Sequence, residues 1–230
     1  MGYDAAVFDM DGVILNSFVE SEEWKFEAVR SALRNEGADP DGLERDELRE
    51  ILGDKGYKAC VKKAMEVGVN PRDIWTEVAE RTVSARKRQL ENGDFQLYDG
   101  VRETLESIHR EVEMALISNA PDEAVMLTVD HFDLKEYFEF YLGIRNFEDL
   151  QARKPHPNHL EVAKAEINKE SPLYVGDAES DIIAAHRADM DAVWVNRDGV
   201  NPEKLDVSPE YEVREISEIL EIIKTGQDAA

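Results

Sequence analysis

Hydrophobic and polar positions follow three successive patterns along this chain. Residues 5–8 form a short, wholly apolar run, which predicts a strand buried on both faces. From residue 18 to about residue 92, apolar side chains recur at helical spacing, with no strand pattern among them. Beyond residue 93, short apolar runs alternate with helical patterns. The chain therefore divides into a strand, a helical block and an alternating segment.

The helical block is expected to hold four helices. The first three end near Gly37, at Gly53 and near Gly68. Pro71 opens the fourth, because proline fits the first turn of a helix. The block follows the carboxyl end of the first predicted strand, so it is placed to cover a site there.

The alternating segment predicts a parallel sheet, because strands that alternate with helices are joined by right-handed crossovers. The expected strands are residues 114–117, 138–142, 173–175 and 192–195, and the expected helices begin at residue 100 and span residues 121–132, 157–167, 180–187 and 216–223. The predicted fold class is α/β, with a Rossmann-like core formed by residues 1–17 and 93–230. Residues 18–92 would form an inserted four-helix cap domain.

The charge balance narrows the classes of partner. The chain has 230 residues, with 51 acidic against 27 basic side chains and a net charge of −24. This charge would repel a phosphate backbone, so nucleic acid is not expected as a partner. The acidic residues are spread along the chain, which indicates a solvated surface in a salt-rich cytoplasm where screening relieves self-repulsion. An anionic substrate would need local cations.

Cysteine content and hydropathy indicate the compartment. Cys60 is the only cysteine, which excludes an intrachain disulfide and a cysteine-based zinc cluster and favours a reducing cytoplasm. No run of about 18 apolar residues occurs, so no membrane span is expected. The N-terminus has no basic segment leading into an apolar one, so no signal peptide is predicted. We expect a cytoplasmic monomer or weak homodimer.

Two carboxylates lie where the first strand ends. Asp9 follows the apolar run directly, and Asp11 precedes Gly12, which permits a turn. Carboxylates at the mouth of a buried strand are costly unless they are paired, protonated or bound to a cation. Ligands of open α/β sheets bind beyond such strand ends. The stretch therefore predicts a metal-assisted site, although Asp39 and Asp41 repeat its spacing in a predicted loop.

Two further strand ends carry polar side chains. Ser118 and Asn119 follow the second predicted strand and precede a predicted helix. They are expected either to cap that helix or to form an anion site with its free N–H groups. Asp177 follows the fourth predicted strand and is predicted to bind a metal through oxygen. Asp181 lies at a helix start, where it either supports that metal or interacts with the helix dipole.

Lys154 is the cation expected at this site. It lies in the stretch Arg153-Lys154-Pro155-His156-Pro157, whose two prolines stiffen the loop, so the loop can hold the lysine in a fixed direction. We interpret His156 and His159 as supporting or surface residues rather than as a metal pair. The chain has no Gly-x-Gly-x-x-Gly and no Gly-rich loop ending in Gly-Lys-Ser/Thr, which leaves dinucleotide and P-loop functions unsupported.

The set of candidate residues fits phosphoryl transfer. It supplies a carboxylate nucleophile, a second carboxylate beside it, a hydroxyl and amides for an anion, one cation and a metal ligand. Phosphoryl transfer needs an in-line nucleophile and positive charge on the equatorial oxygens. A carboxylate nucleophile that forms an aspartyl-phosphate is established chemistry.

These motifs, in this order, resemble the haloacid dehalogenase superfamily over nearly the whole chain. They are Phe8-Asp9-Met10-Asp11-Gly12, Ser118-Asn119, Arg153-Lys154-Pro155, and Val175-Gly176-Asp177 through Asp181. The helical block resembles the mobile cap of the family, and residues 98–101 resemble the segment where the chain re-enters the core. The similarity is greatest to members with a helical cap that are phosphoglycolate-phosphatase-like or β-phosphoglucomutase-like.

The resemblance implies a role for each residue in the chemistry. Asp9 would be the nucleophile, and Asp11 would protonate the leaving oxygen and then activate water. Ser118 and Lys154 would hold the phosphoryl oxygens, with Asn119 as a further phosphate contact. The implied function is hydrolysis of a small phosphorylated metabolite through an aspartyl-phosphate.

The resemblance also implies Mg2+ as the cofactor. The ion would be bound by Asp9, by the backbone carbonyl of Asp11 and by Asp177, with Asp181 supporting it through water. A sugar phosphomutase, which returns the phosphoryl group to its substrate, is the alternative with the same chemistry. A binding or regulatory protein without turnover is the alternative of a different class, and the intact motifs argue against it.

Asp11 also separates phosphate chemistry from two other activities of the superfamily. Dehalogenases and phosphonoacetaldehyde hydrolases lack the second aspartate of the first motif. The latter use a cap lysine, for which Lys55 and Lys58 would be the candidates. The presence of Asp11 therefore favours phosphomonoester substrates.

Overall fold

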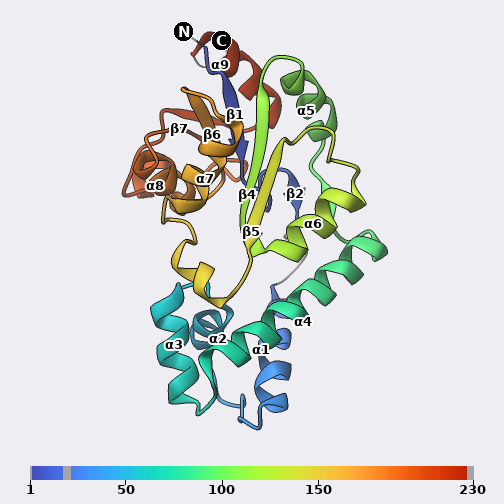
Figure 1. Ribbon diagram of the computed structural model, residues 1–230, viewed down its shortest axis with the longest axis vertical. Helices are drawn as coiled ribbons and strands as arrows, with labels where there is room; N and C mark the ends of the chain where they lie inside the picture. Colours follow the sequence, from blue (N-terminus) through green and yellow to red (C-terminus); the bar gives the residue numbers. More distant parts are fainter. Residues whose placement is uncertain (1, 18–21, 227–230) are drawn as a thin grey trace.

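The structure is a computed structural model that describes residues 2–17 and 22–226. Its centre is a parallel sheet of six strands in the order β5-β4-β1-β6-β7-β8 (Figure 1). The strands are β1 (Ala5–Phe8), β4 (Glu113–Pro121), β5 (Phe140–Ile144), β6 (Pro172–Gly176), β7 (Asp191–Val195) and β8 (Tyr211–Val213). The central strand β1 pairs with β4 on one side and with β6 on the other.

Helices cover both faces of this sheet, which explains why β1 is apolar at every position. The helices on one face are α5 (Val101–His109), α6 (Asp122–His131) and α9 (Ile219–Thr225), and those on the other are α7 (Asn158–Ile167) and α8 (Glu179–Arg187). Ala6 and Phe8 pack into the first layer, and Ala5 and Val7 into the second. The predicted α/β class with a Rossmann-like parallel sheet is confirmed.

Four helices form a separate unit at the lower end of Figure 1. They are α1 (Glu23–Asn35), α2 (Arg45–Leu52), α3 (Tyr57–Glu66) and α4 (Pro71–Asn92). This four-helix unit has its own core, in which Phe26, Leu33 and Ile74 are fully or almost fully buried. The chain enters and leaves it through β2 (Leu15–Asn16) and β3 (Gln96–Leu97), which pair antiparallel. Residues 18–21, where the helical pattern is predicted to begin, lie outside the described residues.

Several element boundaries differ from the sequence-based expectation. β4 continues to Pro121, so Ser118 and Asn119 are extended and do not belong to a helix N-terminus. The reason is that β4 keeps pairing with β5 after an irregularity in register between Ile117 and Pro121. The short strands β2, β3 and β8 are not predicted, since two or three residues carry no periodic signal. In the described ranges, no helix is both long and apolar enough to cross a membrane.

Candidate active site

The candidate residues from all four motifs meet in one cavity. This cavity has a volume of about 500 Å³ and is lined by the sheet's strand ends and by the four-helix unit. The residues that the sequence singles out all line it, namely Asp9, Asp11, Ser118, Asn119, Lys154, Asp177 and Asp181. They come together because β1, β4 and β6 are adjacent and parallel, so their carboxyl ends share one edge of the sheet.

The turn after β1 packs closely on the turn after β6. Asp9, which is only 7% exposed, still donates its backbone N–H to the Val175 carbonyl at 2.8 Å. Gly12 has a φ of +86°, and a Cβ atom there would overlap the carboxylate of Asp177. Glycine is therefore required at residue 12 both for its backbone conformation and for this close approach.

Lys154 is buried among the carboxylates. Its Nζ donates to Asp9 Oδ1 at 2.6 Å and to the Tyr174 hydroxyl at 2.7 Å, and it lies 2.6 Å from Asp181 Oδ1. The Tyr174 hydroxyl in turn donates to Asp181 Oδ1 at 3.1 Å. Burial alone would lower the pKa of Lys154, but Asp181 and Asp9 raise it above its ordinary value, so the ammonium stays charged.

Asn119 positions the loop that carries Lys154. Its Oδ1 accepts the Lys154 backbone N–H at 2.9 Å, and its Nδ2 donates to the Lys154 carbonyl at 3.2 Å, beside a cis peptide bond to Pro155. The side chain expected to contact phosphate is thus engaged in holding the lysine. Ser118, 2% exposed, accepts a hydrogen bond from the Ala120 N–H at 3.1 Å. Its expected role as a helix cap is wrong, because α6 begins only at Asp122 without a side-chain cap.

Asp9, Asp177 and Asp181 form a group that fits a divalent cation. Each offers a carboxylate oxygen, and these oxygens all lie within 4.8 Å of one another. Three carboxylates around a single ammonium leave an excess of negative charge, and their oxygens are the donors that hard cations prefer. Burial, followed by the charges of Asp181 and Asp177, raises the pKa of Asp9 although Lys154 opposes this. Burial and Asp181 raise the pKa of Asp177 to about 7.

Asp181 differs from the other two carboxylates in having both oxygens engaged. Oδ1 lies against Lys154 and Tyr174, and Oδ2 accepts the Ala178 N–H at 3.0 Å at the start of α8. The two interpretations of Asp181 from the sequence, as support for a metal and as a helix-terminal charge, are therefore both compatible with its position.

Two side chains at the site have no counterpart in the sequence-based prediction. Tyr174 precedes the Val175-Gly176-Asp177 motif and links Lys154 to Asp181, as described above. Arg86 comes from α4 and donates Nη2 to both Asp11 oxygens at 2.9 Å each. Burial is the largest single influence and would raise the pKa of Asp11, but the charge and hydrogen bonds of Arg86, together with Ser17 and Lys25, outweigh it and lower that pKa.

The cavity is locally balanced in charge, in contrast to the whole chain. Its lining carries six acidic and six basic side chains, whereas the chain has 51 and 27. The basic ones are Lys25, Arg49, Lys55, Arg86, Arg153 and Lys154. The cations that an anionic substrate needs are therefore concentrated at this cavity.

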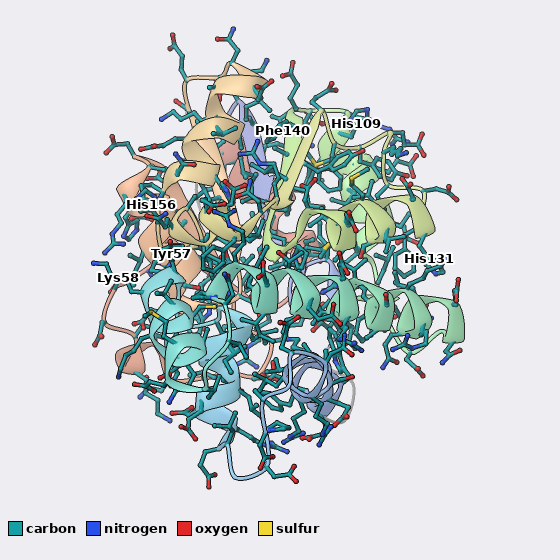
Figure 2. All side chains as sticks on the ribbon, turned by 60° about the horizontal axis from the view of Figure 1, so that its bottom comes forward. Tyr57, Lys58, His109, His131, Phe140 and His156 are labelled. Carbon is teal, nitrogen blue, oxygen red and sulfur yellow. The ribbon has the colours of Figure 1, made fainter. Side chains whose placement is uncertain are left out.

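The histidines and Lys58, one of the two candidate cap lysines, do not line the cavity. None of the five histidines, all within the described ranges, lines the cavity. Figure 2 shows His156 and Lys58 at the outside of the molecule, where both are exposed. His159 is 1% exposed, and neither ring nitrogen has a hydrogen-bond partner among the described residues. The histidines thus do not form a metal pair at this site.

Comparison with known proteins identifies the family. A family model for haloacid dehalogenase-like hydrolases matches residues 6–195. The chain is 30% identical to phosphoglycolate phosphatase 1 of Pseudomonas aeruginosa, over 79% of this chain and 65% of that protein. It is 27% identical to the phosphoglycolate phosphatase of Rhodobacter capsulatus, over 89% of each. The structure of CbbY from Rhodobacter sphaeroides in complex with phosphate shares the fold, with a TM-score of 0.70 at 19% identity, over 94% of this chain and 96% of that one. The chain belongs to the haloacid dehalogenase-like hydrolases.

Proposed function

We propose that this protein is a Mg2+-dependent phosphatase that hydrolyses a small phosphomonoester through an aspartyl-phosphate on Asp9. The observation that carries this proposal is the buried contact between Lys154 and Asp9, beside Asp177 and Asp181, at the mouth of the central strand. A carboxylate with a cation beside it, facing a cavity of about 500 Å³, fits a nucleophile that receives a phosphoryl group.

In the first proposed step, the Asp9 carboxylate attacks phosphorus and the bond from phosphorus to the leaving oxygen breaks. Because Arg86 lowers the pKa of Asp11, its proton is the one taken from water in the second step of the preceding turnover; Asp11 gives this proton to the leaving oxygen, which departs as an alcohol. In the second step water attacks the phosphorus of the aspartyl-phosphate and loses a proton to Asp11, and the Asp9 carboxylate is regenerated. Lys154 and Ser118 hold the phosphoryl oxygens in both steps, since they lie beside Asp9 on the neighbouring strand and loop.

Mg2+ would be held by Asp9, Asp177 and the backbone carbonyl of Asp11, with Asp181 in support. When bound, it would neutralise charge on the transferring phosphoryl group. The four-helix unit would act as a cap, with residues 18–92 as the cap domain and residues 1–17 and 93–230 as the core. Its cations Lys25, Arg49 and Lys55 line the cavity opposite the strand ends.

The substrate class follows from the balanced charge of the cavity and from the relatives. A small phosphorylated metabolite fits the cavity volume, and the net charge of −24 disfavours nucleic acid. The curated relatives named above are phosphoglycolate phosphatases, so phosphoglycolate is the first compound to test. We propose a cytoplasmic location for this reaction.

The test measures phosphate release from p-nitrophenyl phosphate, phosphoglycolate and a panel of sugar phosphates, with Mg2+ and with EDTA. Wild type should turn over at least one of them with Mg2+, and Asp9→Asn should be inactive yet folded. Asp41→Asn is the matched control, because Asp39-Pro40-Asp41-Gly42 repeats the first motif's spacing on an exposed loop. No turnover by folded wild type would indicate a binding protein, and phosphoryl return to a sugar phosphate would indicate a mutase.

A further inference from the structure

Arg86 is an unusual residue on its helix. α4 carries several arginines, and most are at least partly exposed, but Arg86 is only 4% exposed. It reaches out of the four-helix unit to the turn after β1, where Nη2 donates to both oxygens of Asp11 at 2.9 Å. A buried arginine that spans two parts of a structure needs partners for its charge and for its planar group.

Two further contacts hold the guanidinium independently of Asp11. It lies over the ring of Phe95, 5.6 Å from the centroid, and Phe95 is fully buried. Its Nη1 donates to Thr128 Oγ1 on α6 at 3.5 Å. The Thr128 hydroxyl donates to the Ala124 carbonyl, so its oxygen is available to accept from Arg86. The position of Arg86 is therefore determined by α4, α6 and the segment after α4 together.

Asp11 is less constrained by its own segment. It follows the end of β1 in a turn that contains Gly12, and its side chain is 25% exposed toward the cavity. Because both of its oxygens accept from one nitrogen of Arg86, the direction of the carboxylate is set by that nitrogen. The hydroxyl of Ser17 contributes one more hydrogen bond to it.

We infer that Arg86 is a positioning residue, which orients the carboxylate of Asp11 for proton transfer and does so only while α4 packs against α6. This rests on the proposed function, since Asp11 is the group that protonates the leaving oxygen there. α4 and α6 are in contact in this structure. The four-helix unit thereby controls the proton-transfer group of the core through one side chain.

The leaving group of the substrate distinguishes this role from a purely structural one. Nitrophenolate leaves as an anion without being protonated, whereas an alkoxide must receive a proton as it leaves. Arg86→Gln should therefore slow hydrolysis of an alkyl phosphate by about 10²-fold, the cost of misplacing a catalytic group by about 1 Å. It should change the release of nitrophenolate in the first turnover much less, because this release precedes the second step, in which Asp11 activates water for either substrate. Arg86→Lys, which keeps a single donating cation, should restore part of the alkyl phosphate rate.

The decisive measurement is a double-mutant cycle with Asp11→Asn. If Arg86 acts through Asp11, Arg86→Gln should cause no further loss of alkyl phosphate turnover in the Asp11→Asn background. Wild type, the two single variants and the double variant, all freed of metal, should also show shifts in melting temperature that do not add. Arg88→Gln is the control, because Arg88 is exposed on the same helix. If Arg86→Gln does not fold, Arg86→Lys takes its place in the cycle.

The outcomes separate this inference from the proposed function. Wild type without phosphatase turnover refutes the proposed function and the role of Arg86 with it. Active wild type whose Arg86 variant slows the first-turnover release of both leaving groups equally, or whose losses add to those of Asp11→Asn, overturns only the role of Arg86.

Discussion

Tyr174→Phe removes one oxygen from the centre of the site and little else. The hydroxyl is fully buried, accepts from Lys154 at 2.7 Å and donates to Asp181 at 3.1 Å. Burial raises its pKa well above the ordinary value, so it stays a neutral donor at all working pH values. The substitution therefore tests how much one neutral hydroxyl stabilises a buried group of charges.

The expected loss in the free energy of unfolding depends on which interactions Lys154 and Asp181 keep in the variant. Lys154 retains Asp9 and Asp181, and Asp181 retains Lys154 and the Ala178 N–H, so neither charge loses its last partner. A hydrogen bond to a charged group contributes about 1.5–3 kcal/mol, and we expect a loss in this range rather than twice it. For a chain of this length each kcal/mol shifts the melting temperature by about 2–4 °C, which gives a decrease of about 3–12 °C.

The assay is thermal and urea unfolding in EDTA, followed by circular dichroism. Tyr57→Phe is the matched control, because the described residues include no hydrogen-bond partner for the Tyr57 hydroxyl, and its midpoint should hardly move. A Tyr174→Phe variant as stable as wild type would refute the reasoning, since the hydroxyl would then contribute no net stabilisation to the charges around it.

Three further predictions concern the metal, a histidine and salt. Asp177→Ala should sharply raise the Mg2+ concentration needed for turnover, whereas zinc-dependent activity that ignores this change would contradict the proposed site. Burial lowers the pKa of His159 in the folded protein below 6.5, so as the pH falls the unfolded chain binds a proton at this residue before the folded protein does. His159 therefore destabilises the folded protein increasingly as the pH falls below about 6.5. His159→Leu should therefore be more stable than wild type in urea by about 1–3 kcal/mol near neutral pH, and by more near pH 5; an equal or smaller gap at pH 5 would contradict this. At net −24, the melting temperature should rise with KCl as the Debye length falls from about 10 Å at 0.1 M to about 3 Å at 1 M, and a flat or falling series would reject adaptation to salt.

The sequence predicts the parts of this structure that rest on periodicity and strand ends. Residues 5–8 are apolar because helices cover both sheet faces, and Asp9 and Asp177 gather because parallel strands end at one edge. The extended path at Ser118 cannot be predicted in this way, because it depends on pairing with β5 across an irregular register.

The helical spacing of Arg86 is a sequence signal that the prediction of the site did not use. Arg86 lies four residues after Thr82 and four before Leu90, which are both buried, so helical spacing places it on the inner face of α4. A basic residue on such a face is a candidate for pairing with a buried carboxylate. Its partner Asp11, however, lies 75 positions away, and only the packing of α4 against α6 brings the two together.

The pairing of β2 with β3 has a consequence for how the chain can be rebuilt. Asn16 and Gln96 are directly opposite partners in a two-stranded sheet that is separate from the six-stranded one, so the segment between them begins and ends at adjacent points. Insertions are tolerated where the two ends of the inserted chain lie close together. Helical units of other lengths could therefore be exchanged at this junction, provided that Leu90 and Phe95, which belong to the core beside the six-stranded sheet, are kept. The four-helix unit that we propose acts as a cap is therefore exchangeable, whereas Asp9, the proposed nucleophile, directly follows β1 and stays with the core.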